Sequence, residues 1–175
     1  IGVEYTLVQL LGKGGMGEVW KAKALYQAGP GVEDDVDTDV ALKFIRGLDP
    51  ILNELMIKEA KITARLKHEN IVHFNGWGFI PDKKKYLISM DYIEGMDVNG
   101  LMQRHNLINE EKPRHVHLLG SNIRRIPDKM VAFIMFQVAA GLDYAHNFKY
   151  NSSRGVYHRD MSPGNILIKS DEGRV

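Results

Sequence analysis

The first half of the chain alternates apolar and polar positions in short runs that are typical of β-strands. Such runs cover residues 5–11, 19–24 and 40–45, and a glycine cluster at 12–17 separates the first two. Two strands around a glycine-rich turn predict a β-hairpin. Residues 27–39 are acidic and rich in turn formers, so we expect a loop before the third strand.

A helix is predicted after the third strand, over residues 50–67. Asp49 suits its N-cap and Pro50 its first position. Apolar residues recur along this segment at helical spacing, and Glu59 lies on the resulting stripe. The pattern therefore predicts a helix that buries one face and carries a carboxylate on it.

Two further strands are predicted before the chain changes character. The first covers residues 71–74, and we expect it to end where Gly76 and Gly78 interrupt the run. The second covers residues 86–92, which are largely apolar. The first half is therefore rich in strands and contains one helix.

Helices are expected to dominate the second half. A short helix is predicted over residues 97–105 and a long one over 129–147, with Asp128 as its N-cap. Strands followed by helices indicate the α+β class.

The last part of the chain predicts a polar loop between two short strands. Residues 151–155 are expected to form a loop, followed by strands at 156–157 and 166–168. The loop between these strands covers residues 158–165. A loop held on a scaffold of this kind is a common place for reactive groups.

Charge and composition exclude several classes of function. Basic and acidic residues number 23 and 22, which gives a net charge of +1 and no global attraction to nucleic acid. The chain has no cysteine, which excludes disulfide scaffolds and thiolate chemistry. The most apolar run, residues 130–142, is too short to span a bilayer.

Lys43 and Glu59 are each unusual for their position. Lys43 interrupts an apolar strand, and its ammonium needs an anionic partner or a route to water. Glu59 on an apolar stripe is costly unless it is paired. The two side chains therefore suggest each other as partners. Two other interpretations stay open: an edge-strand lysine that prevents aggregation, and a glutamate that reaches water at the edge of the stripe.

The polar loop contains residues suited to proton transfer and metal binding. The carboxylate of Asp160 could accept a hydroxyl proton, and the amide oxygen of Asn165 is a good Mg²⁺ ligand. Turn formation alone would also explain this composition. The glycine cluster leads into a strand rather than a helix, which argues against a dinucleotide site and leaves a glycine hairpin over phosphates.

Together these motifs resemble the protein kinase family. The chain contains Gly12-x-Gly14-x-x-Gly17-x-Val19, Val40-Ala41-Leu42-Lys43, and His158-Arg159-Asp160 with Asn165 five residues on, in the family's order. The glycine motif looks most like that of bacterial serine/threonine kinases of eukaryotic type. The resemblance implies a kinase-like α+β fold: an antiparallel N-lobe sheet with one helix and the hinge strand in residues 1–93, then the beginning of a mainly helical C-lobe in 94–175.

The resemblance also assigns roles to individual residues. Lys43 would hold the α- and β-phosphates of ATP and pair with Glu59, Asp160 would accept the substrate proton, and Asn165 would bind Mg²⁺. The remaining ATP-binding positions come from the glycine hairpin, the third strand and the hinge region: Leu11, Gly12, Lys13, Gly14, Gly15, Met16, Gly17, Glu18, Val19, Ala41, Met90, Asp91, Ile93 and Asp97.

The implied activity is the transfer of the ATP γ-phosphate to Ser/Thr hydroxyls of proteins. Ser162 stands where serine/threonine kinases usually have a lysine, which keeps a pseudokinase or ATP-binding scaffold open as an alternative. A small-molecule kinase is a third reading, from which the His-Arg-Asp sequence points away. The chain ends before any Asp-Phe-Gly motif, so we expect it to be inactive alone. A cytoplasmic location is implied, with room for a membrane anchor in a C-terminal segment of the full-length protein.

Overall fold

The computed structural model describes residues 3–15, 17–26, 36–46, 58, 60–104, 126–150 and 153–170. Contacts divide the chain into two compact units. The first contains Ile1–Tyr92 and Phe148–Val156, and the second contains Ile93–Asn147 and Tyr157–Val175.

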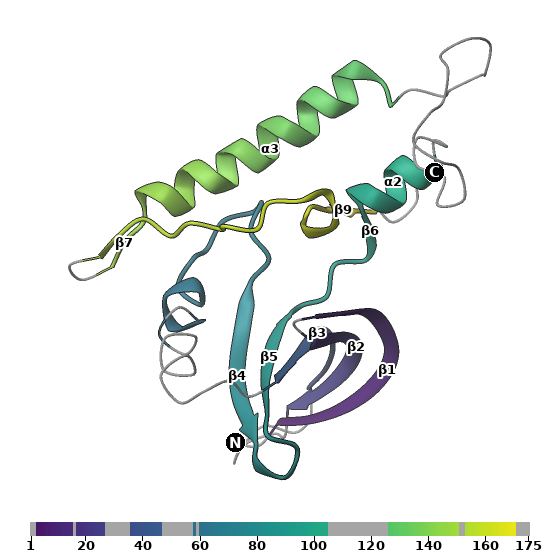
Figure 1. Ribbon diagram of the computed structural model, residues 1–175, viewed down its shortest axis with the longest axis vertical. Coiled ribbons are helices and arrows are strands. Elements are labelled where there is room, and N and C mark those ends of the chain that lie inside the picture. Colours follow the sequence, from purple (N-terminus) through teal and green to yellow (C-terminus); the bar gives the residue numbers. More distant parts are fainter. Residues whose placement is uncertain are drawn as a thin grey trace. The chain divides into compact units, whose positions relative to one another are not determined.

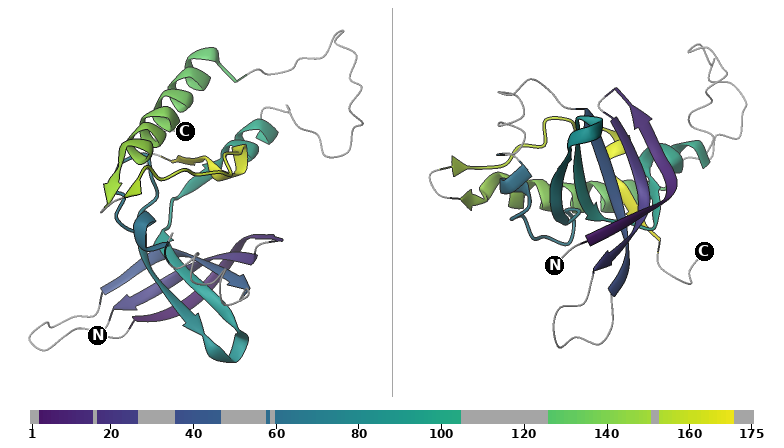
Figure 2. Two further views of the ribbon diagram at one scale, coloured as in Figure 1. Left: turned by 60° about the vertical axis from the view of Figure 1, so that its left-hand side comes forward. Right: turned by 90° about the horizontal axis from the view of Figure 1, so that it is seen from below.

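A five-stranded antiparallel sheet forms most of the first unit (Figure 1). Figure 2 shows that its strands lie side by side in one strongly twisted sheet. The spatial order is β1-β2-β3-β5-β4, which makes β3 the central strand. The strands are β1 Val3–Gly14, β2 Gly17–Tyr26, β3 Val36–Arg46, β4 Phe74–Ile80 and β5 Lys85–Asp91.

The core of this unit lies on one face of β2 and β3. Ala22, Ala24, Val40 and Leu42 are at most 1% exposed, so they are completely enclosed. Ala22 lies directly opposite Val40 in the β2–β3 register, and opposite residues in an antiparallel pair share a face. The predicted hairpin of β1 and β2 is confirmed, and its strands extend into the glycine cluster.

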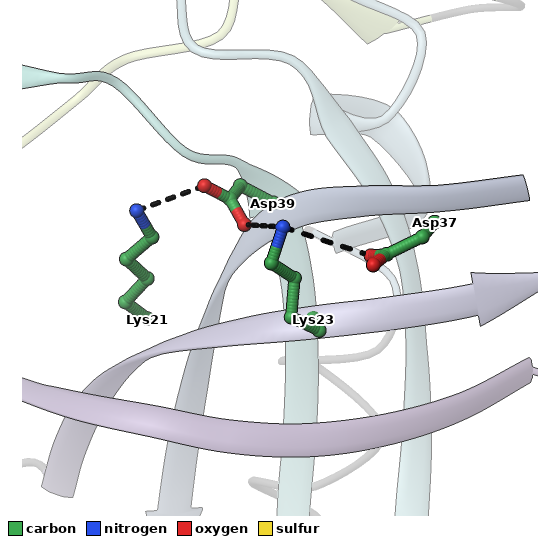
Figure 3. A network of polar contacts seen from close by, with 4 residues as sticks. All are labelled: Lys21, Lys23, Asp37 and Asp39. Atoms are coloured by element: carbon green, nitrogen blue, oxygen red, sulfur yellow. Dashed lines mark ion pairs between the residues drawn. The ribbon is translucent and has the colours of Figure 1, made fainter.

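The acidic segment before the third strand is not all loop, because β3 already begins at Val36. Lys21 and Lys23 of β2 stabilise it there: Nζ of Lys21 lies 2.8 Å from Oδ2 of Asp39, and Nζ of Lys23 lies 2.9 Å from Oδ1 of Asp39 and 3.8 Å from Oδ1 of Asp37 (Figure 3). The two ammonium groups hold the pKa of Asp39 below its usual value. The prediction of a loop over 36–39 was therefore wrong.

The fourth strand also differs from its prediction. It begins at Phe74 and continues through Gly76 and Gly78, which pair with Ser89 and Leu87 of β5. The short 3₁₀ turn η1, Pro81–Lys83, joins β4 to β5. The ladder with β5 holds the strand together where local propensity would have ended it.

Part of the predicted helix is described. Lys58 and residues 60–63 are helical, and the chain leaves the helix at residues 64–65. Asp49, Pro50 and Glu59 lie outside the described residues. The N-cap and the position of the glutamate therefore stay predictions.

The described residues of the second unit form a small pair of strands and two helices. Strand β6, Gly95–Asp97, pairs antiparallel with β9, Leu167–Lys169. A Cβ on Gly95, whose φ is 152°, would overlap the carbonyl oxygen of Ile168, so only glycine allows this close approach. The helices are α2 Val98–Arg104 and α3 Asp128–Asn147, and the 3₁₀ turn η2 covers Pro163–Asn165.

Residues after α3 correct two further predictions. Part of the loop expected at 151–155 is a strand, β8, Ser153–Arg154, which pairs with β7, Lys149–Tyr150. Val156 and Tyr157 are not in a strand; the Tyr157 ring instead lies 4.9 Å from that of His146. None of the helices in the described part of the chain is long and apolar enough to cross a membrane.

Candidate active site

The glycine hairpin closes on a backbone contact that requires glycine. Gly14 and Gly17 pair across the end of the hairpin and Gly15 forms its turn, while Met16 lies outside the described residues. Gly17 has φ of 143°, and a Cβ there would overlap the carbonyl oxygen of Phe44 on β3. The start of β2 can therefore lie against β3 only because residue 17 has no side chain.

We expect Gly17→Ala to destabilise the first unit while Gly15→Ala does not. The alanine at 17 meets both an unfavourable φ and the β3 backbone, and strain of this kind costs about 1–3 kcal/mol. Gly15 is a matched control, because a Cβ there would meet nothing within 4 Å. Urea unfolding of both variants measures the difference. Equal stability of the two variants would show that β2 does not approach β3 this closely.

The tip of the hairpin carries a cross-strand ion pair. Lys13 and Glu18 lie opposite each other in the register, and the Lys13 ammonium is 3.2 Å from the Glu18 carboxylate. The indole N–H of Trp20 donates to the same carboxylate at 3.4 Å. These contacts lower the pKa of Glu18, and the contact with Lys13 contributes most. The predicted ATP-binding positions on β1 and in the turn after it are exposed: Leu11, Gly12, Lys13, Gly14 and Gly15.

Lys43 stands at the centre of the sheet. It pairs with Val19 of β2 and Ile88 of β5, and its side chain is half-buried. Because β3 has a strand on each side, the interpretation of Lys43 as an edge-strand lysine is wrong. Among the described residues none forms an ion pair with it, and Glu59 lies outside them, so the Lys43–Glu59 pair stays a prediction.

The structure gathers several predicted ATP-binding residues on one face of this sheet. Ala41 pairs with Met90, and two positions along the same strands Lys43 pairs with Ile88. Residues two apart share a face, as do residues directly opposite. Val19, Ala41, Lys43 and Met90 therefore share one face, opposite to the one that carries the core.

The end of β5 is fixed on its β4 side. The backbone N–H of Asp91 donates to the carbonyl oxygen of His73 at 3.0 Å, and the side-chain amide of Asn75 donates to Oδ1 of Asp91 at 3.0 Å. The next residue, Tyr92, ends the N-terminal segment of the first unit, and Ile93 begins the second unit.

Asp97 begins helix α2 in the second unit. Its Oδ1 accepts a hydrogen bond of 2.7 Å from the backbone N–H of Gly100, which is the geometry of an N-cap. A Cβ added to Gly164 would lie 3.1 Å from Nδ2 of Asn99 and 3.8 Å from Oδ2 of Asp97. Asp97 therefore lies beside the turn that carries Asn165.

Asp160 and Asn165 are in direct contact. The Asn165 side-chain amide donates to the backbone oxygen of Asp160 at 2.7 Å and to its Oδ2 at 3.1 Å. The backbone N–H of Asp160 donates to Nδ1 of His158 at 3.3 Å, and Arg159 between them has a left-handed φ of 61°. The Asp160 side chain is exposed. Asp160 is therefore exposed to solvent and is held in place by Asn165, the residue predicted to act with it.

These two side chains fit a Mg²⁺ site by their donor chemistry. The side-chain nitrogen of Asn165 donates its hydrogen bonds to Asp160, and its side-chain oxygen is available to a cation. Carboxylate and carboxamide oxygens are the hard ligands that Mg²⁺ takes, usually together with substrate phosphates.

A cavity of about 480 Å³ lies elsewhere in the first unit. It is bordered by the described part of the helix, by the beginning of β4 and by Tyr150, with the guanidinium of Arg65 4.2 Å from the Tyr150 ring centroid. None of the described residues predicted to bind ATP borders it.

The sequence reasoning missed Lys21, Asp39 and Tyr92. The ammonium of Lys21 lies 4.3 Å from the centroid of the Tyr92 ring and also contacts Asp39. The available signal was charge spacing: lysines at 21 and 23 face aspartates at 37 and 39 if the two strands pair in this register.

The protein kinase domain family matches residues 5–175 of the chain. The chain therefore belongs to the protein kinase family. The crystal structure of the Mycobacterium tuberculosis PknI kinase domain is similar, with a TM-score of 0.63 and 28% identity over 95% of this chain and 55% of that chain. The predicted kinase-like α+β fold is thereby confirmed.

Curated relatives carry two kinds of kinase name. Serine/threonine-protein kinase PknH of Mycobacterium tuberculosis is 32% identical over 96% of this chain and 22% of its own length. Tyrosine-protein kinase MasK of Myxococcus xanthus is 30% identical over 94% of this chain and 23% of its own length. The chain thus spans less than a quarter of these two relatives.

Proposed function

We propose that the protein containing this chain is an ATP- and Mg²⁺-dependent kinase that phosphorylates Ser/Thr hydroxyls of other proteins. The observation that carries the proposal is the contact between Asp160 and Asn165, which puts a proton acceptor and a Mg²⁺ ligand in one loop. Membership of the protein kinase family supports it, as does the serine/threonine kinase name of PknH.

In this proposal the two lobes supply different parts of the reaction. Residues 1–93 form the kinase N-lobe, in which the glycine hairpin covers ATP and Lys43 holds its α- and β-phosphates. Residues 94–175 begin the C-lobe, in which the Asp160 carboxylate accepts the hydroxyl proton. The substrate oxygen bonds to the γ-phosphorus as the bond to the β–γ bridging oxygen breaks, and ADP leaves. Bound Mg²⁺, held through Asn165, would neutralise phosphate charge.

Positioning and charge account for most of the catalysis in such a site. The bonds from Asn165 hold the Asp160 carboxylate at a set place in its loop, and that place decides how well the hydroxyl proton is received. The proposal locates the domain in the cytoplasm, where ATP is available.

The experiment is transfer of labelled phosphate from ATP to a generic protein substrate by the full-length protein, followed by phosphoamino-acid analysis. Phosphoserine and phosphothreonine are the expected products. The phosphorylated amino acid must be identified because Ser162 departs from the serine/threonine kinase pattern and MasK is named a tyrosine kinase. Phosphotyrosine as the product would mean that the substrates are tyrosine hydroxyls instead. Nucleotide binding without transfer would favour an ATP-binding scaffold instead.

A further inference from the structure

Lys21 occupies an unusual place for a surface lysine. It lies opposite Ala41 on β3, and Ala41 lies opposite Met90 on β5, so the three residues form one row across the sheet. Ala41 and Met90 are among the positions that the resemblance to the kinase family assigns to ATP binding. The side chain of Lys21 is only 21% exposed, so neighbouring residues cover most of it.

The ammonium of Lys21 has two partners on different elements. It lies 2.8 Å from Oδ2 of Asp39 on β3 and 4.3 Å from the centroid of the Tyr92 ring, just beyond the end of β5. The carboxylate holds the ammonium in place (Figure 3), and the ammonium is attracted by the electron-rich face of the ring. Asp39 and Lys21 therefore hold the Tyr92 ring against the sheet.

Tyr92 is the point where this anchoring matters. It is the last residue of the first unit's N-terminal segment and follows Asp91, whose backbone the resemblance to the kinase family places at the adenine edge. Asp91 is held on the β4 side by His73 and Asn75. Lys21 supplies a second anchor from β2, one residue further along.

We propose that Lys21 is a positioning residue for adenine: held by Asp39, it fixes the Tyr92 ring and so the neighbouring backbone that receives the base. The inference rests on the proposed ATP site. It adds a residue from β2 that the sequence motifs of that site do not include.

Lys23 is a matched control within the same strand. Two positions apart on β2, both side chains lie on the same face, and both contact Asp39. The aromatic contact described for Lys21 has no counterpart described for Lys23. Lys21→Met and Lys23→Met therefore each remove one ion pair with Asp39, but only the first removes the cation–π contact.

The test is calorimetric binding of adenosine and of Mg²⁺–ATP to the full-length protein and to Lys21→Met, Lys21→Arg and Lys23→Met. Adenosine is uncharged, so its affinity does not respond to a lost attraction for phosphate. We expect Lys21→Met to weaken adenosine binding about two- to fivefold, the range of an exposed to partly buried cation–π contact. Lys21→Arg should restore it, because a guanidinium can both stack and pair, and Lys23→Met should leave it unchanged.

Each other outcome decides against the proposal. Equal weakening by Lys21→Met and Lys23→Met would mean that the ion pairs act on the sheet as a whole, which thermal unfolding of both variants would also register. Weaker ATP binding with unchanged adenosine binding would mean that Lys21 attracts phosphates. Failure of the unsubstituted protein to bind adenosine or ATP would overturn the proposed site itself.

Discussion

Asp160→Asn in the full-length protein is expected to lower kcat for phosphoryl transfer by about 10²–10⁴-fold, the usual contribution of a positioned acid or base. Asparagine is nearly the same size and keeps a side-chain oxygen that can accept the bond from Asn165 now made to Oδ2. It cannot take up the hydroxyl proton. The loop should therefore keep its geometry while the reaction loses its base.

Asp143→Asn is a matched control for this substitution. Oδ1 of Asp143 also accepts a bond from an asparagine side chain, Nδ2 of Asn147, at 3.0 Å, and both aspartates are exposed residues of the second unit. The control variant should keep its turnover, and steady-state kinetics with saturating ATP measures both variants. Turnover of Asp160→Asn within a few-fold of the unsubstituted protein would remove Asp160 from the role of proton acceptor.

The local sequence pattern was enough to predict the features that depend on residues close together in the sequence. The β1–β2 hairpin follows from a glycine cluster between two alternating runs, and helix α3 follows from an apolar periodic segment, although Asp128, predicted as its N-cap, is its first helical residue. The site loop was also predictable, because Asp160 and Asn165 are only five residues apart and a tight turn brings them together. In each case the information lies within a few residues.

Features that depend on a partner distant in the chain were missed. Asp37 and Asp39 read as an acidic loop, and they lie in β3 because Lys21 and Lys23 on the next strand compensate their charges. β4 crosses Gly78 because β5 supplies its hydrogen bonds. Reading the sequence one segment at a time does not show which residues of two strands lie opposite each other. The β2–β3 and β4–β5 pairings could therefore not be derived.

Lys43 illustrates both sides of this limit. Its unfavourable place in an apolar strand made it a candidate functional residue, with an edge-strand lysine as the alternative. The strand order β1-β2-β3-β5-β4 excludes the edge-strand alternative, and the functional role stays a prediction. The glycine hairpin and Lys43 then lie on adjoining strands, as a phosphate-binding role requires.

Lys43→Met in the full-length protein is expected to lower kcat about 10²–10³-fold, the usual cost of removing one preorganised electrostatic contact to a reacting group. Methionine keeps an unbranched apolar stem between Val19 and Ile88 and removes only the charge. Because a half-buried ammonium is costly to desolvate, stability should be unchanged or higher. Loss of activity combined with retained stability would identify a functional lysine rather than a structural one.

Lys23→Met serves again as the control, since it removes an ammonium from the same face of the sheet at a site 49% exposed. It should leave kcat unchanged, so a fall shared by both variants would point to the overall charge of that face. Urea unfolding run alongside the kinetics separates chemistry from folding. Lys43→Met with near-normal kcat would show that the central ammonium does not hold the phosphates, and the assignment of this face to ATP would then have to be withdrawn.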